Sequence, residues 1–221
     1  VTKECADYGT LQSCALNPRC RWGSTCVSAE ANGCPETDVV IVFGDSYSFG
    51  GRTGRHPNGF IGMLEALRSW VKYTDLTRIQ VGLVEFASSG VKSNGGLASD
   101  LATVETNINW HEENYQKATA QPNLKPALEQ AYSLLSAGSA TNKLVVVITD
   151  SAPADVDGSA SYATTMADAG IKVLAVGLRM TIAPTVSPTD LALRSALGLL
   201  TQDESRLRLT YLDDAFRSLF T

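Results

Sequence analysis

The segment Asp38-Val-Val-Ile-Val-Phe-Gly-Asp-Ser-Tyr-Ser48 decides the fold. It contains five consecutive apolar residues, most of them β-branched, which predict a strand that is buried on both faces, as in the parallel sheets of α/β proteins. The apolar run stops at a group of small polar residues. Because ligands in such folds bind outside the carboxyl ends of the strands, we expect Asp45, Ser46 and Ser48 to lie at a functional site.

Strand and helix patterns alternate along the rest of the chain. Further strands are predicted at residues 78–86, 143–150, 170–178 and 206–212, with a short edge hairpin within 88–96. Helices are predicted at residues 60–71, 99–109, 124–137, 159–169, 189–199 and 215–219, and residues 109–123 are expected to be polar and irregular. The alternation predicts an α/β fold with a doubly wound, mainly parallel six-stranded sheet flanked by helices.

Length and composition restrict the class of protein. The chain has 221 residues, 44% hydrophobic content and a net charge of −5, which suits one sizeable core and a small appendage. Lys and Arg are scattered, so we expect no nucleic-acid partner and no attraction to an anionic membrane surface. No apolar run approaches the roughly 20 residues that span a bilayer, so we expect no membrane insertion.

The cysteines divide the chain in two. All five lie within the first 34 residues, at Cys5, Cys14, Cys20, Cys26 and Cys34. The segment 1–36 is too short and too poor in aliphatic residues for a core of its own, so we expect it to be disulfide-rich and the protein to be extracellular. A zinc site is disfavoured, because no Cys-x-x-Cys pair and no His occurs there. Two disulfides leave one thiol over, and the pairings stay open.

The stretch Cys14-Ala-Leu-Asn-Pro-Arg-Cys20-Arg-Trp22 resembles the plexin-semaphorin-integrin (PSI) module, in which a Pro shortly precedes a Cys and a Trp follows it. Gly23 stands where that family often has another cysteine, so its disulfide pattern does not carry over. The alternative is a disulfide-tied leader that packs on the main domain.

Residues 37–221 resemble a von Willebrand factor A (vWA) domain, the fold of integrin inserted domains. The resemblance rests on Arg78-Ile-Gln-Val-Gly-Leu-Val-Glu-Phe86, Leu144-Val-Val-Val-Ile-Thr-Asp150 and Ala169-Gly-Ile-Lys-Val-Leu-Ala-Val-Gly-Leu178. It implies a doubly wound sheet and an adhesive or assembly function.

The vWA resemblance also implies a metal-ion-dependent adhesion site for magnesium or manganese. The family builds this site from Asp-x-Ser-x-Ser, a Thr before a later helix and an Asp after the fourth strand. Here Ser46, Ser48 and Asp150 are in register, but Gly44 replaces the leading Asp, Asp45 lies one residue late and Pro122 stands at the Thr position. We therefore expect a degenerate site of Asp45, Ser46, Ser48 and Asp150 that binds an ion weakly or not at all.

A rival interpretation is enzymatic. Phe43-Gly-Asp-Ser-Tyr-Ser48 resembles the nucleophile block of GDSL (SGNH-type) esterases, with Ser46 as nucleophile. Such enzymes need a His base with an Asp three residues before it, and neither His56 nor His111 has one. Both histidines are expected to be solvated in polar loops, and Asp155, Asp157 and Asp168 are expected on the solvated surface.

The sequence thus favours a secreted or cell-surface adhesion module without enzymatic activity. We expect its partner to be an extracellular protein, a glycan or another copy of the chain.

Overall fold

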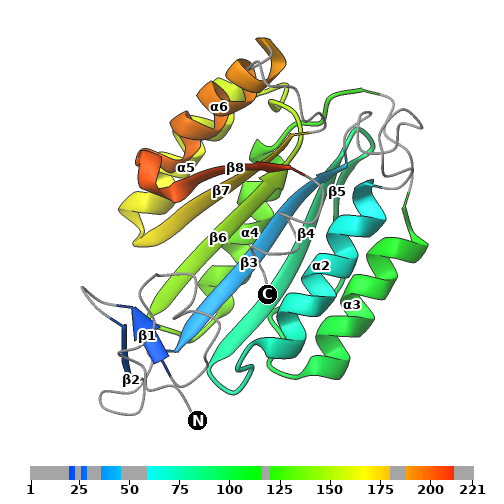
Figure 1. Cartoon of the computed structure of the whole chain (residues 1–221), viewed down its shortest axis with the longest axis vertical. Helices are drawn as coiled ribbons and strands as arrows, with labels where there is room; N and C mark the ends of the chain where they lie inside the picture. The colour runs from blue at the N-terminus through cyan, green and yellow to red at the C-terminus, as the bar shows by residue number, and fades with distance from the viewer. Residues whose placement is uncertain are drawn as a thin grey trace.

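A computed structural model of the chain describes residues 20–22, 26–28, 36–45, 59–115, 120–179 and 188–211. Its centre is a six-stranded sheet of order β5-β4-β3-β6-β7-β8, in which only β5 runs antiparallel to its neighbour (Figure 1). The strands are β3 (Thr37–Asp45), β4 (Ile79–Ala87), β5 (Gly90–Ser93), β6 (Asn142–Thr149), β7 (Ile171–Arg179) and β8 (Leu207–Tyr211). The doubly wound, mainly parallel sheet predicted from the sequence is confirmed.

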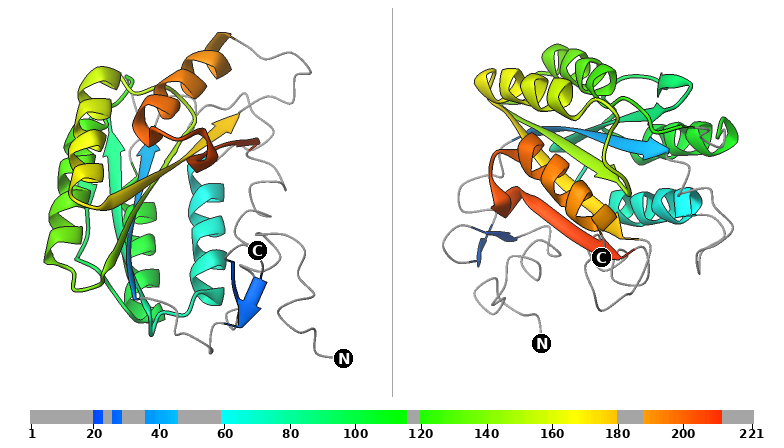
Figure 2. Two further views of the ribbon diagram at one scale, coloured as in Figure 1. Left: turned by 90° about the vertical axis from the view of Figure 1, so that its left-hand side faces the viewer. Right: turned by 90° about the horizontal axis from the view of Figure 1, so that it is seen from above.

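Helices cover both faces of this sheet (Figure 2). Helices α2 (Gly59–Tyr73) and α3 (Leu101–Glu113) pack on one face, and α4 (Lys125–Ala137), α5 (Val156–Asp168) and α6 (Pro188–Thr201) pack on the other. The terminal helix expected at 215–219 lies outside the described residues. Among the described helices, none has the length and apolar character needed to cross a membrane.

Strand β3 is the central strand, between β4 and β6, and it belongs to both cores. Val40 and Val42 pack toward α4, while Val39, Ile41 and Phe43 pack toward α2 and α3. All five are buried, which explains why the segment is continuously apolar rather than alternating.

Helix α3 is longer than the sequence predicted. It continues to Glu113, so the expectation of an irregular chain from residue 109 is wrong for its first residues. The buried face of this helix consists of Val104, Asn107, Ile108 and His111, which have helical spacing. Two of the four are polar, and this weakened the apolar periodicity on which the prediction depended.

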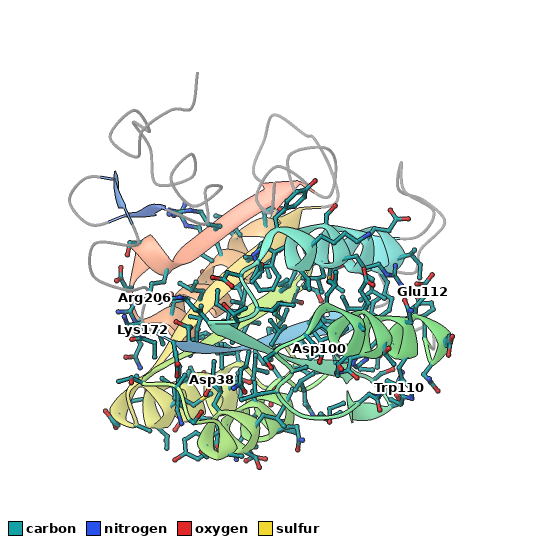
Figure 3. The ribbon with its side chains drawn as sticks, turned by 90° about the horizontal axis from the view of Figure 1, so that it is seen from below. Asp38, Asp100, Trp110, Glu112, Lys172 and Arg206 are labelled. Atoms are coloured by element: carbon teal, nitrogen blue, oxygen red, sulfur yellow. The ribbon has the colours of Figure 1, made fainter. Side chains whose placement is uncertain are left out.

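Asp38 lies at the start of β3, at the amino ends of the parallel strands, and connects β3 to the segment between α4 and β6. Its side chain is buried and its Oδ2 accepts a hydrogen bond from the backbone N–H of Ala140, at 3.1 Å, between α4 and β6. Figure 3 views the molecule from this end and labels Asp38. The chain approaches so closely here that a Cβ on Gly138 would lie 2.1 Å from Asp38 Oδ2. The hydrogen bond between Asp38 and Ala140 joins residues that are 102 positions apart.

In the cysteine-rich segment, β1 (Cys20–Trp22) and β2 (Cys26–Ser28) form an antiparallel pair. Cys20 lies opposite Ser28 and Cys26 lies opposite Trp22, so the two cysteines are diagonal neighbours. Diagonal residues are about 7–8 Å apart, whereas the Cα atoms of a disulfide are about 4.4–6.8 Å apart. We therefore expect Cys20 and Cys26 to bond to other cysteines and not to each other.

Alkylation without reduction, followed by digestion and mass spectrometry, tests this expectation. Trypsin cuts after Arg19 and Arg21, and a glutamate-specific protease cuts after Glu30, so the two cysteines end in separate peptides. We expect four of the five thiols to be oxidised and no peptide that joins Cys20 to Cys26. Five alkylated thiols before reduction would contradict the disulfides, and a Cys20–Cys26 link would contradict the register.

Candidate functional site at the carboxyl edge of the sheet

The carboxyl ends of β3, β4 and β6 lie along one edge of the sheet (Figure 1). Asp45 ends β3 opposite Ala87, and Asp150 directly follows β6 with 6% of its surface exposed. The loop before α4 reaches the same edge, because the carbonyl of Pro122 accepts a hydrogen bond from Ala154 N–H at 3.1 Å. Two of the three loops named from the sequence, the one before α4 and the one after β6, therefore meet, and the third, after Asp45, lies outside the described residues.

The structure does not describe every residue of the predicted site. Ser46, Ser48 and His56 lie outside the described residues, and Asp45 is described only through its backbone. Their roles as ligands therefore stay predictions.

Gly44 lies where the vWA resemblance expects the leading Asp, and Phe86 lies opposite it on β4. A Cβ atom on Gly44 would be 2.6 Å from Cζ of Phe86 and 3.0 Å from its Cε2. Phe86 is buried beneath α4 in a core that includes Leu124 and Leu128, so a shift of its ring would disturb the packing of this core. The ring thus fills the space that a side chain at position 44 would need.

Pro122 lies where the resemblance expects a Thr ligand. It is buried, has no side-chain donor or acceptor, and its carbonyl is bound to Ala154 N–H. On the neighbouring loop, the Thr149 hydroxyl donates to the Ser151 carbonyl at 2.9 Å. Backbone and hydroxyl hydrogen bonds hold both loops.

Asp155 was expected on the solvated surface, but it is half-buried and hydrogen-bonded to the protein. Its carboxylate accepts hydrogen bonds from the backbone N–H groups of Leu124 at 2.7 Å and Lys125 at 2.9 Å, and from the Ser159 hydroxyl at 3.0 Å. Asp155 therefore connects the loop after β6 to the first turn of α4. A sequence signal for this role does exist: α4 begins after Leu124, which cannot cap a helix, so the cap has to come from elsewhere.

These residues fit a divalent ion poorly. Hard cations need several oxygen ligands to offset the loss of hydration, yet position 44 is filled by the Phe86 ring and position 122 offers a hydrocarbon ring. Within the part of the chain that the structure describes, no group of three or more His, Cys, Asp and Glu residues is arranged to hold a metal.

On the α2–α3 side of the same edge, the structure contains a buried ionic cluster that the sequence did not reveal. Nδ1 of His111 lies 2.9 Å from Glu85 Oε2, and the Lys92 ammonium donates to Glu85 Oε1 at 2.9 Å. Glu85 and His111 are fully buried, and Lys92 also donates to the carbonyl of Asn114. The expectation that His111 is solvated in a polar loop is therefore wrong.

This cluster bears on the esterase interpretation, which needs a His paired with a carboxylate. His111 and Glu85 form such a pair, and Phe43, three residues before Ser46, packs against the His111 ring with centroids 5.0 Å apart. The imidazole, however, has no exposed surface, and Trp110 packs on it with centroids 5.0 Å apart. A general base must reach the proton that it abstracts, so this buried ring is poorly placed for catalysis.

Comparisons with known proteins agree with the fold. The family model for the von Willebrand factor type A domain matches residues 38–214. The chain belongs to the von Willebrand factor type A family. The match begins at residue 38, so it gives no support to the PSI-like interpretation of residues 1–36. A search by sequence among curated proteins gives no match.

Solved structures share the vWA fold at low sequence identity. Proximal thread matrix protein 1 from the mussel byssus is 17% identical, with a TM-score of 0.66 over 84% of this chain and 47% of its own. The pilus adhesin SpaC from Lactobacillus rhamnosus GG is 15% identical, with a TM-score of 0.68 over 86% of this chain and 30% of its own.

A single-domain neighbour matches over most of its length. The vWF domain of the type V pili tip protein Mfa5 from Porphyromonas gingivalis is 11% identical, with a TM-score of 0.63 over 84% of this chain and 93% of its own. This chain spans less than half of the mussel protein and of SpaC.

The buried cluster in this vWA domain predicts an asymmetric response to mutation. Lys92→Met removes the cation that balances buried Glu85 and should lower the free energy of unfolding by about 3–5 kcal/mol in chemical denaturation. Lys72→Met is the matched control, because Lys72 is exposed and lies 3.7 Å from Glu105, and it should cost less than about 1 kcal/mol. Equal effects of the two substitutions would contradict the role given to Lys92.

Proposed function

We propose that this chain is an extracellular adhesion or assembly module. In this proposal the vWA domain binds a protein, a glycan or another copy of the chain at the carboxyl edge of its sheet. The observation that carries the proposal is the vWA family match over residues 38–214. Two structural neighbours, a pilus adhesin and a byssal matrix protein, support an adhesive or assembly role and an extracellular location.

The carboxyl edge is the best candidate for the binding surface. Loops position functional side chains in α/β folds at this edge, and exposed residues such as Ser88, Ser89 and Asn123 are held there by a rigid scaffold. The chain has no strongly charged composition to attract a polyanion, so we propose recognition by hydrogen bonding and shape.

A metal is not required by this proposal. One solved form of the mussel matrix protein is described with a zinc-occupied site of the metal-ion-dependent adhesion type. In the present chain, Gly44 and Pro122 replace two of the ligands that the resemblance implies. We propose that Asp45, Ser46, Ser48 and Asp150 form a degenerate site with little affinity for magnesium or manganese.

Binding of the whole chain to surfaces coated with extracellular-matrix proteins, with glycans or with the chain itself tests the proposal. Asn123→Arg places a large charged side chain on the proposed surface and should weaken binding by roughly tenfold or more. Ala167→Arg, on the exposed face of α5, is the matched control and should leave binding unchanged. No binding above an albumin-coated surface, or an equal loss in both variants, would contradict the proposal.

The esterase alternative has its own test. Because His111 is buried, the purified protein should not hydrolyse short-chain p-nitrophenyl esters above the rate of Ser46→Ala. A turnover that Ser46→Ala abolishes would replace the adhesion proposal with the enzymatic one.

A further inference from the structure

We propose that Phe86 and Asp155 perform the structural task of a bound cation at the carboxyl edge, so that the edge has one arrangement whether or not divalent ions are present. The inference rests on the proposed function, because it concerns how the same binding surface is regulated. A cation held by several loops fixes them relative to one another. Here that connection is made by a carboxylate, a backbone hydrogen bond and an aromatic ring.

The start of α4 is capped by a residue from outside the helix. The first amide groups of a helix have no acceptor within the helix, and an anionic side chain is favoured beside them. Leu124 supplies no side-chain cap, and Pro126 has no N–H to satisfy. Asp155, which is 31 and 30 positions away, accepts from both Leu124 and Lys125.

The C-terminal end of α4 is held by β6, the strand that precedes the loop of Asp155. The Lys143 ammonium of β6 donates to the carbonyls of Leu135 at 2.5 Å and Gly138 at 3.2 Å, which lie at the end of the helix. A cation at a helix C-terminus satisfies its last carbonyl groups and its dipole. Strand β6 and the loop after it therefore fix α4 at both ends, and the loop before α4 has little freedom to move.

Gly44 and Phe86 lie opposite each other on β3 and β4. A carboxylate at position 44 would bring a ligand to the edge, but the Phe86 ring lies 2.6 Å from the place of its Cβ. Phe86 packs in the same core as Leu124 and Ala127, below the loop that Asp155 holds. The ring thus excludes a side-chain ligand and supports the first turn of α4 from beneath.

As a consequence, binding of a cation does not change the conformation of this binding surface. A ligand shifts a conformational equilibrium only if it binds one state more tightly than the other. With the loops joined by protein contacts and two ligand positions lost, a divalent ion has no second arrangement to select. The part of the binding surface formed by the loop before α4 and the loop after β6 therefore has the same structure with and without ions, and regulation of binding has to come from partner concentration or from other parts of the protein.

Thermal melting of the whole chain tests this inference with manganese or with chelator. Asp155→Ala should lower the melting temperature by about 3–8 °C, since it removes a helix cap. Asp157→Ala is the matched control. Asp157 is exposed in the first turn of α5, and its substitution should lower the melting temperature by less than about 2 °C. None of the three proteins should respond to a few millimolar manganese.

Two outcomes would overturn the inference. One is a wild-type melting temperature that rises by more than about 5 °C with manganese and loses this rise in Asp150→Ala. The other is an equal effect of Asp155→Ala and Asp157→Ala. Neither outcome depends on partner binding, so a failed binding experiment and a failed melting experiment are distinguishable.

A mutant cycle tests the role of Phe86. Gly44→Ala should lower the stability of the wild-type protein more than it lowers the stability of the Phe86→Leu variant. The reason is that leucine lacks the Cε and Cζ atoms that meet the added Cβ. If Gly44→Ala alone does not fold, recovery of a cooperative melting transition in the double variant gives the same support. Equal destabilisation in both backgrounds, or no recovery, would overturn the role of the ring.

Discussion

The burial of β3 on both faces is the constraint on which the rest of this structure depends. Side chains on successive positions of a strand point to opposite faces, so each face of β3 organises a different half of the carboxyl edge. Phe43 points toward α3 and meets the His111 ring of the buried cluster. The Cβ position of Gly44 faces the other side of the sheet, toward the Phe86 ring beneath α4. One strand therefore positions both the ionic cluster and the aromatic contact that shape the edge.

Most of the fold could be predicted, because continuous apolar runs identify buried parallel strands directly from local sequence. The elements that could not be predicted depend on distant partners. The last turn of α3 was missed because buried His111 looks polar until Glu85, 26 positions away, is known to pair with it. Asp155 was missed for the same reason, since its partners on α4 are about 30 positions away.

The sequence predicted a candidate site at the carboxyl ends of the strands, and the roles of Asp45, Ser46, Ser48 and Asp150 in it stay predictions. The order of the strands predicted that Asp45, Pro122 and Asp150 lie at the same end of the sheet, and Gly44 could be recognised from the sequence as the loss of a ligand. What the sequence could not show is that Phe86 occupies the vacated space and that Asp155 bridges two loops. The loss of two ligands is thus accompanied by contacts that join the loop before α4 to the loop after β6.

Native-state hydrogen exchange at the amides of Leu124 and Lys125 is the most direct measurement of this account. These two amides donate to Asp155, and a site that needs an ion to order its loops would leave them open to solvent in chelator. Both amides should be strongly protected, with the same exchange rates in chelator and in manganese. Fast exchange in chelator that manganese slows would contradict this account.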